Sequence, residues 1–167
     1  MLKTFETFWS PDAKKLILRY FEDPADEMDI IPVTKTFSAL LTATTTSTTT
    51  PSLQGIFLPQ SVGAVITSPE ENKIFYLGAI ENGVMGILSD FENKKQTSIL
   101  KISFKEFNIS WPSKNIIALL TKPSNKAEGF FYSLDIKTGK FEKIIGGIKG
   151  LTASLSPNGE KMIYSRS

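Results

Sequence analysis

Residues 155–164 of this chain read LSPNGEKMIY, and the pattern recurs three more times in varied form. The other copies are FWSPDAKKLIL at 8–18, ITSPEENKIFY at 66–76 and ISWPSKNIIA at 109–118. Each copy has apolar or aromatic residues before a proline, then a polar turn and an apolar run. The turn of the third copy is one residue shorter. Proline suits the first corner of a turn and cannot donate a ladder hydrogen bond. Each copy therefore predicts a hairpin that joins two strands.

The spacing of the copies indicates the architecture. Pro11, Pro69, Pro112 and Pro157 are 58, 43 and 45 residues apart, and a propeller blade repeats about every 40–45 residues. The long first interval contains a tract, 42–51, with seven threonines in ten positions. Removing an insertion of about that size brings the first interval close to the other two. The period predicts an all-β fold, a β-propeller fragment of about three four-stranded antiparallel blades plus half a blade.

Hydrophobic patterning supports the same fold. Strands with one face in water alternate apolar and polar residues, but the strands after the turns are near-continuous apolar runs at 16–20, 74–80, 116–120 and 162–164. Blades that stack around an axis cover both faces of their middle strands. The predicted fourth strands, 96–103 and 140–148, mix lysine with isoleucine, which is typical of an exposed outer edge. Between the third and fourth strands of the third blade, the segment 135–140 predicts a tight turn around Gly139.

We therefore expect one domain, a partial propeller over 1–167. Its predicted parts are blade 1 at about 4–61 with a threonine-rich insertion at about 36–54, blade 2 at about 62–105, blade 3 at about 106–149 and a half-blade at 150–167. Propellers typically close with four to eight blades, so open ends would expose apolar blade faces. We expect the chain either to be a piece of a longer product or to complete itself with another copy.

Two segments carry a family resemblance. SPNGEKMIY at 156–164 resembles the Ser-Pro-Asp-Gly-Lys signature of TolB-like, WD-repeat-like propeller repeats, and FYSLDIKTGK at 131–140 resembles their third strand and turn. Ala13 and Glu71 stand where that family prefers glycine, and the third copy lacks that residue. The resemblance implies the fold and hardly restricts the function. TolB-like propellers often act in the bacterial cell envelope, which would imply an export signal, and residues 1–11 show no signal-peptide pattern.

Composition excludes several kinds of site. The chain has no cysteine and no histidine, which excludes disulfides, zinc–thiolate sites, cysteine nucleophiles, a Ser-His-Asp triad and imidazole metal sites. The net charge is +2, and apolar residues interrupt the densest basic group, Lys94, Lys95, Lys101 and Lys105. A nucleic-acid footprint is a clustered stripe, so no nucleic-acid partner is expected. No apolar run approaches the length of a membrane helix, so no membrane insertion is expected.

Carboxylates are the acid–base groups that remain, in two places. Glu70 and Glu71 are neighbours in a predicted turn, and a loop carries Asp23, Asp26, Glu27 and Asp29. Glycosidases need two carboxyls that converge on one cleft, whereas sequence neighbours in a turn point apart. The loop does not have the spacing of an EF-hand. We predict neither a catalytic pair nor a calcium site.

Three further motifs have structural interpretations. No helix pattern follows the glycines of 146–150, so we interpret this segment as a connection between blades rather than a phosphate loop. The glycosylation triplet at 108–110 falls in a predicted inner strand, and we interpret it as a chance match. Trp9 and Trp111 occupy nearly equivalent repeat positions and are predicted to be core residues, with an aromatic carbohydrate platform as the alternative. No catalytic, cofactor-binding or metal-binding residue is predicted.

Two functions from different classes follow. The favoured one is a non-enzymatic interaction or scaffold module that offers its loop face or channel mouth to a protein or peptide, as part of a longer protein. The alternative is an accessory propeller of a larger hydrolase, such as the gating propeller of prolyl-oligopeptidase-like enzymes. The catalytic domain would then lie outside these residues, because the chain has no histidine.

Overall fold

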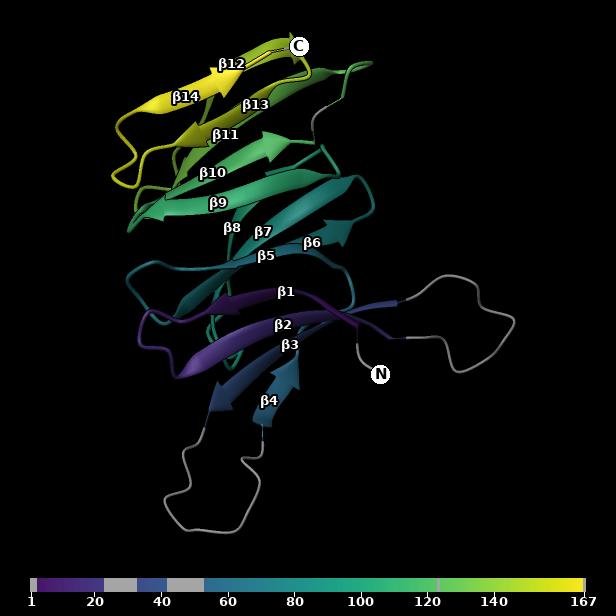
Figure 1. Cartoon of the computed structure of the whole chain (residues 1–167), viewed down its shortest axis with the longest axis vertical. Coiled ribbons are helices and arrows are strands. Elements are labelled where there is room, and N and C mark those ends of the chain that lie inside the picture. Colours follow the sequence, from purple (N-terminus) through teal and green to yellow (C-terminus); the bar gives the residue numbers. More distant parts are fainter. Residues whose placement is uncertain (1–2, 23–32, 42–52, 123, 167) are drawn as a thin grey trace, which may run out of the picture.

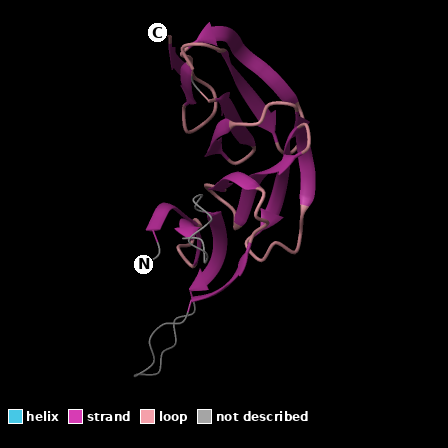
Figure 2. Ribbon diagram, turned by 90° about the vertical axis from the view of Figure 1, so that its right-hand side faces the viewer, coloured by secondary structure: helices cyan, strands magenta, loops and turns pink. Residues whose placement is uncertain are grey.

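The computed structural model describes residues 3–22, 33–41, 53–122 and 124–166, and the regular elements within these ranges are all strands. They form three four-stranded antiparallel sheets and one two-stranded sheet. Figure 2 shows the sheets following one another along an arc. This is the all-β, blade-like arrangement that the repeat predicts. The described part of the chain contains no helix long and apolar enough to cross a membrane.

Each sheet is built from strands that are consecutive in the chain. Blade 1 consists of β1 (Lys3–Trp9), β2 (Lys15–Glu22), β3 (Val33–Leu41) and β4 (Leu53–Phe57). Blade 2 consists of β5 (Val62–Thr67), β6 (Lys73–Ile80), β7 (Gly83–Asp90) and β8 (Thr97–Ile102). Blade 3 consists of β9 (Phe107–Ser113), β10 (Ile116–Thr121), β11 (Glu128–Asp135) and β12 (Phe141–Lys149), and the half-blade of β13 (Thr152–Leu155) and β14 (Met162–Ser165).

The first strand of each four-stranded blade lies at a sheet edge. Figure 1 shows β1, β5 and β9 stacked one above another on the same side of the molecule. We call this side the inner side, because the successive first strands of a propeller surround its axis. Any ligand that enters along the axis therefore meets these three strands first.

The turn of the first motif copy is held by its serine. The Ser10 amide donates to the Lys15 carbonyl at 2.9 Å, and the Ser10 hydroxyl donates to Asp12 Oδ1 at 2.6 Å. Asn72, in the next blade, donates to the other Asp12 oxygen at 2.9 Å. These hydrogen bonds, the one from Ser10 first, lower the pKa of Asp12 to about 2. The turn is thus tied to its own hairpin and to the neighbouring one.

The second and fourth copies close in the same way. The amides of Ser68 and Ser156 donate to the carbonyls of Lys73 and Lys161 at 2.9 and 2.8 Å. The Ser156 hydroxyl donates to Asn158 Oδ1 at 2.6 Å, as Ser10 does to its own turn residue. The predicted proline turns are therefore present in three of the four copies.

The third copy differs from the prediction. Pro112 lies within β9, at an irregularity in the pairing of β9 with β10, and the turn itself consists of Lys114 and Asn115. Trp111 stands directly before this proline, where the other copies have serine, and its Nε1 donates to the Lys114 carbonyl at 3.3 Å. Since the copy is one residue shorter, the strand continues through the proline and the hairpin turns later.

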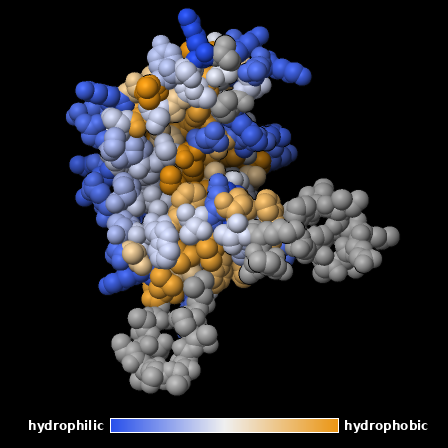
Figure 3. Space-filling model, viewed as in Figure 1, coloured by the Kyte–Doolittle hydropathy of each residue, from blue (hydrophilic) through white to orange (hydrophobic). Residues whose placement is uncertain are grey.

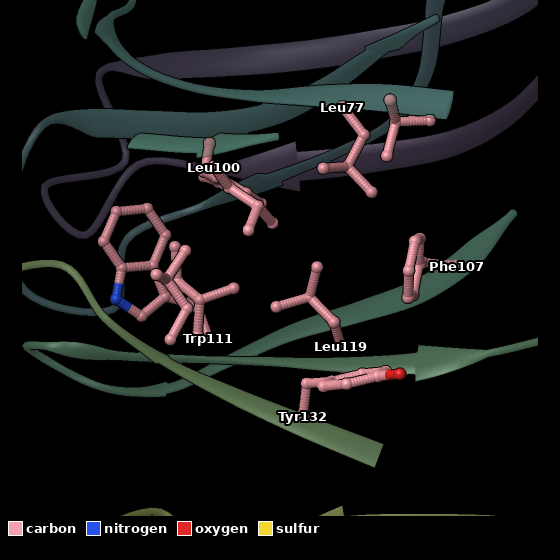
Figure 4. Close-up of a cluster of buried hydrophobic side chains, with 10 residues drawn as sticks. Leu77, Leu100, Phe107, Trp111, Leu119 and Tyr132 are labelled. Carbon is pink, nitrogen blue, oxygen red and sulfur yellow. The ribbon is translucent and has the colours of Figure 1, made fainter. Parts of the chain in front are cut away.

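Side chains alternate between the two faces of a strand, so the core consists of separate clusters between successive blades. In β6, Phe75 and Leu77 belong to a cluster shared with blade 3, whereas Ile74 and Tyr76 belong to one shared with blade 1. All four are at most 2 % exposed. Figure 4 shows the first cluster, with side chains from blades 2 and 3 meeting between the sheets. The apolar run of β6 is therefore buried on both faces, as the patterning predicts.

Two predicted segment boundaries need correction. The insertion expected at about 36–54 is narrower, because β3 continues to Leu41 and β4 begins at Leu53; the tract 42–51 lies outside the described residues. The glycine segment expected to connect blades at 146–150 belongs mostly to β12, which ends at Lys149. The ring of Phe130 occupies the space beside Gly146, so a side chain there would clash.

Two predictions of burial are also wrong. Trp111 is a core residue at 5 % exposed, but Trp9 is 51 % exposed. The apolar run 162–164 was expected to be covered on both faces, yet Ile163 is 76 % exposed. Both side chains lie in the terminal sheets of the arc, where the described residues supply no further sheet to cover the outer face.

Candidate binding site

A cavity of about 490 Å³ lies on the inner side of the molecule, between blades 1, 2 and 3. It is lined by residues of β1, β2, β5, β6, β7 and β9 together with the segment that joins β8 to β9 and Lys122. Its apolar wall includes Phe8, Ala64, Leu77 and Val84. Figure 3, viewed from this side, shows apolar surface running along the middle of the molecule between polar margins.

One wall of the cavity contains a buried cation. Arg19 in β2 is 7 % exposed; its Nη1 lies 2.5 Å from Glu6 Oε2, and its Nη2 donates to the Gly63 carbonyl at 2.9 Å. The guanidinium also lies over the ring of Phe5, 5.1 Å from its centroid. Its Nε has no hydrogen-bond partner among the described residues. Arg19 thus joins blade 1 to a free edge of blade 2.

The opposite wall carries charges that reach solvent. Glu106 and Lys122 form an exposed ion pair, 3.0 Å between Oε2 and Nζ. Lys105 is exposed, and no carboxylate of the described residues pairs with it. Next to them in β9, Phe107 is 8 % exposed and Asn108 is exposed. The wall therefore offers an unpaired ammonium group beside an apolar ring and an amide.

The acidic side chains of the cavity take part in ion pairs. Both cavity carboxylates, Glu6 and Glu106, are ion-paired with cations of the same cavity. Each pair places a positive charge directly beside a carboxylate of the cavity. Within the described residues, no group of three or more acidic, histidine or cysteine side chains is placed to hold a metal ion.

The residues singled out from the sequence are mostly elsewhere. Glu71 pairs with Lys73 at 2.5 Å and with Lys114 at 3.6 Å, and the hydrogen bond and charge of Lys73 lower its pKa. Glu70 and Glu71 both lie in the turn before β6 and do not line the cavity. The acidic loop with Asp23, Asp26, Glu27 and Asp29 lies outside the described residues.

Two sequence candidates do reach the cavity. Asn108, of the glycosylation triplet, lies in β9 as predicted, and Lys105 is the one member of the basic group Lys94, Lys95, Lys101 and Lys105 that lines it. Arg19 was not among the residues predicted from the sequence, although an arginine inside the apolar run LILRY is a visible irregularity. A buried charge requires a partner, and Glu6, whose side chain is 41% exposed, supplies it.

Comparisons with known proteins identify the fold. No family model and no curated protein matches the chain. Among solved structures, TolB from Acinetobacter baumannii is similar, with a TM-score of 0.60 and 15% identity over 98% of this chain and 37% of TolB. An oligogalacturonate lyase in complex with manganese has a TM-score of 0.67 and 13% identity, over 99% of this chain and 48% of the lyase.

A third structure is explicitly a propeller, the β-propeller domain of the Trilobed protease from Pyrococcus furiosus. Its TM-score is 0.60 at 10% identity, over 92% of this chain and 45% of that domain. The chain therefore spans less than half the length of each of these three proteins. Because they include TolB, a lyase and a protease, the similarity is one of fold and not of activity. The chain has the fold of a partial β-propeller, of the kind found in TolB and in the propeller domain of that protease.

Proposed function

We propose that this chain is a non-enzymatic interaction module that binds a protein or peptide segment at the cavity on its inner side. The observation that carries the proposal is the composition of the cavity. An apolar wall, a lysine that no carboxylate of the described residues pairs with, and ion-paired carboxylates stand together between three sheet edges. Recognition sites are mostly apolar with a few polar groups that fix orientation.

The cavity favours an extended, acidic segment with apolar side chains. β1, β5 and β9 are edge strands, so parts of their backbones are free to pair with an added strand. Lys105 favours a carboxylate on the ligand, and the ring of Phe107 favours an apolar side chain next to that carboxylate. Arg19 already donates hydrogen bonds to Glu6 and to the Gly63 carbonyl, so its role is to stabilise the cavity wall rather than to bind the ligand.

The test uses a fluorescein-labelled peptide that alternates glutamate with phenylalanine or leucine, with fluorescence anisotropy as the readout. We expect saturable binding that Lys105→Glu weakens several-fold, because an exposed ion pair contributes about 0.2–1 kcal/mol and the reversed charge adds repulsion. The matched control is Lys101→Glu, which changes an exposed lysine on the outer strand β8. Equal weakening by both variants would mean that binding follows net charge and would refute the assignment of the cavity.

The second candidate is an accessory propeller within a larger hydrolase. It is supported by the likeness to the propeller domain of a protease and by the small share of each neighbour that the chain spans. The coding sequence that follows Ser167 separates the two functions. A nucleophile-elbow hydrolase domain would support the second candidate, whereas further blades alone would support the interaction module.

A further inference from the structure

The outer face of blade 1 is apolar and partly exposed, with Leu16 buried at 5 % exposed. Register pairs place Trp9 beside Leu16, and Thr7 beside Leu18, on the face opposite to Arg19, which contacts blade 2. The same row continues through Phe37 to Phe57 on β3 and β4. We call the face made by these six residues the open face; on it Trp9 is 51 % and Phe57 59 % exposed. In Figure 3, apolar surface gathers at the lower end, over β2, β3 and β4.

The open face has the composition of a face that another blade covers. Counted from the serine of the turn motif, Leu16 and Leu18 are equivalent to Ile74 and Tyr76 of blade 2. Those two residues are 0 % and 1 % exposed and belong to the cluster that blades 1 and 2 share. The open face therefore has apolar side chains at the positions where blade 2 packs against blade 1.

The half-blade has the complementary unpaired face. Ile163 lies seven residues after the serine of its motif, as do Ile17 and Phe75 in the first and second copies. Ile17 and Phe75 are 0 % exposed because the next blade covers them, whereas Ile163 is 76 % exposed. Other half-blade residues, such as Met162, pack against blade 3 instead. Ile163 of the half-blade is therefore an apolar side chain at a position that a following blade covers in the other copies.

We propose that a second copy of this chain covers both the open face and the half-blade. The half-blade of each copy covers the β1–β2 part of the open face of the other, so that Ile163 lies against Leu16 and Leu18. This contact repeats the one between Ile17 and the Ile74–Tyr76 pair inside the chain. The same contact is made twice, related by a two-fold axis, which closes a ring instead of a filament.

The lengths agree with such a ring. One chain spans 48% of the oligogalacturonate lyase and 45% of the protease propeller domain, so two copies together approach one such protein. Two copies place eight sheets around the axis, six of four strands and two of two strands, within the four to eight of closed propellers. The second copy also adds inner strands beside the cavity, on the side where blade 1 is open.

The first test is the mass of the 167-residue chain by light scattering during size-exclusion chromatography. We expect twice the 18.5 kDa of one chain, and a monomeric mass for Ile163→Lys. Folding does not depend on this side chain, since it is 76 % exposed, and circular dichroism checks that the strands remain. Phe57→Lys is the matched control on the outer strand β4, beyond the reach of a two-stranded half-blade, and it should stay dimeric. A monomeric unsubstituted chain, or dissociation by Phe57→Lys alone, would overturn the arrangement.

The second test maps the contact by crosslinking. The chain has no cysteine, so Thr7→Cys and Ile163→Cys introduce the only thiols, one on each proposed partner surface. A short bismaleimide should join two chains in the double variant and in a mixture of the two single variants. Each single variant alone should stay uncrosslinked, because its two thiols lie at different contacts of the ring. Crosslinked Ile163→Cys alone would show the half-blades facing each other and would refute the head-to-tail ring.

Discussion

Gly86 illustrates how tightly a middle strand is enclosed. It lies in β7, where an added Cβ would meet Phe75 Cζ at 2.8 Å and Leu100 Cβ at 2.9 Å. Both neighbours belong to the main core cluster between blades 2 and 3. Their close approach explains a glycine at the centre of a strand, a position where glycine otherwise weakens the structure.

Gly86→Ala should therefore destabilise the protein. We expect the free energy of unfolding to fall by about 1–3 kcal/mol, the usual cost of overpacking a filled core. Gly63→Ala is the control, because the nearest atom to its added Cβ is the Leu77 carbonyl oxygen at 3.9 Å, and it should change stability by less than about 0.5 kcal/mol. Urea unfolding followed by circular dichroism measures both. Equal stability of the two variants would show that Phe75 and Leu100 do not crowd position 86.

At the scale of the element, three of the four motif hairpins share a serine directly before the proline. The Ser10 hydroxyl donates to Asp12 and accepts from the Lys15 amide at 2.9 Å, and Ser10 is 3 % exposed. In the third copy Trp111 takes that place, and Ser110 lies one position earlier, within β9. One position in the motif thus has two structural solutions.

Ser10→Ala should weaken its hairpin where Ser110→Ala should not. Loss of the hydroxyl leaves the Lys15 amide without its partner, which should lower the free energy of unfolding by about 1–2 kcal/mol. Ser110→Ala should stay within about 0.5 kcal/mol. Thermal and urea unfolding of the two single variants measure the difference. A Ser110→Ala loss as large as that of Ser10→Ala would mean that the third hairpin is held as the others are.

The elements themselves were largely predictable from the repeat. Its period and apolar runs locate the middle strands, and the tight turn at Gly139, where φ is 72°, was recognisable because glycine tolerates this conformation. Pro112 was not predictable, because a turn one residue shorter moves the proline into the strand. The exposure of Trp9 was hidden as well, since it depends on whether another sheet covers blade 1. The cavity was hidden because its residues come from strands far apart in the sequence.

At the scale of the whole molecule, the defining feature is a sheet covered on both faces by like sheets. Blade 2 holds this position, with blade 1 against one face and blade 3 against the other. Alternate buried side chains along one strand therefore contact different neighbouring blades. The open face and the half-blade have side chains equivalent to those of this blade-to-blade contact. Within the described residues, no neighbouring sheet covers them.

Nuclear Overhauser effects across β6 test this arrangement most directly. In a sample with labelled methyl groups and aromatic rings, Ile74 should show contacts to Ile17 of blade 1, and Phe75 should show contacts to Leu119 of blade 3. The account predicts that these two adjacent residues have no neighbour in common beyond their own blade. Contacts from both residues to the same neighbouring sheet, or to none, would contradict it.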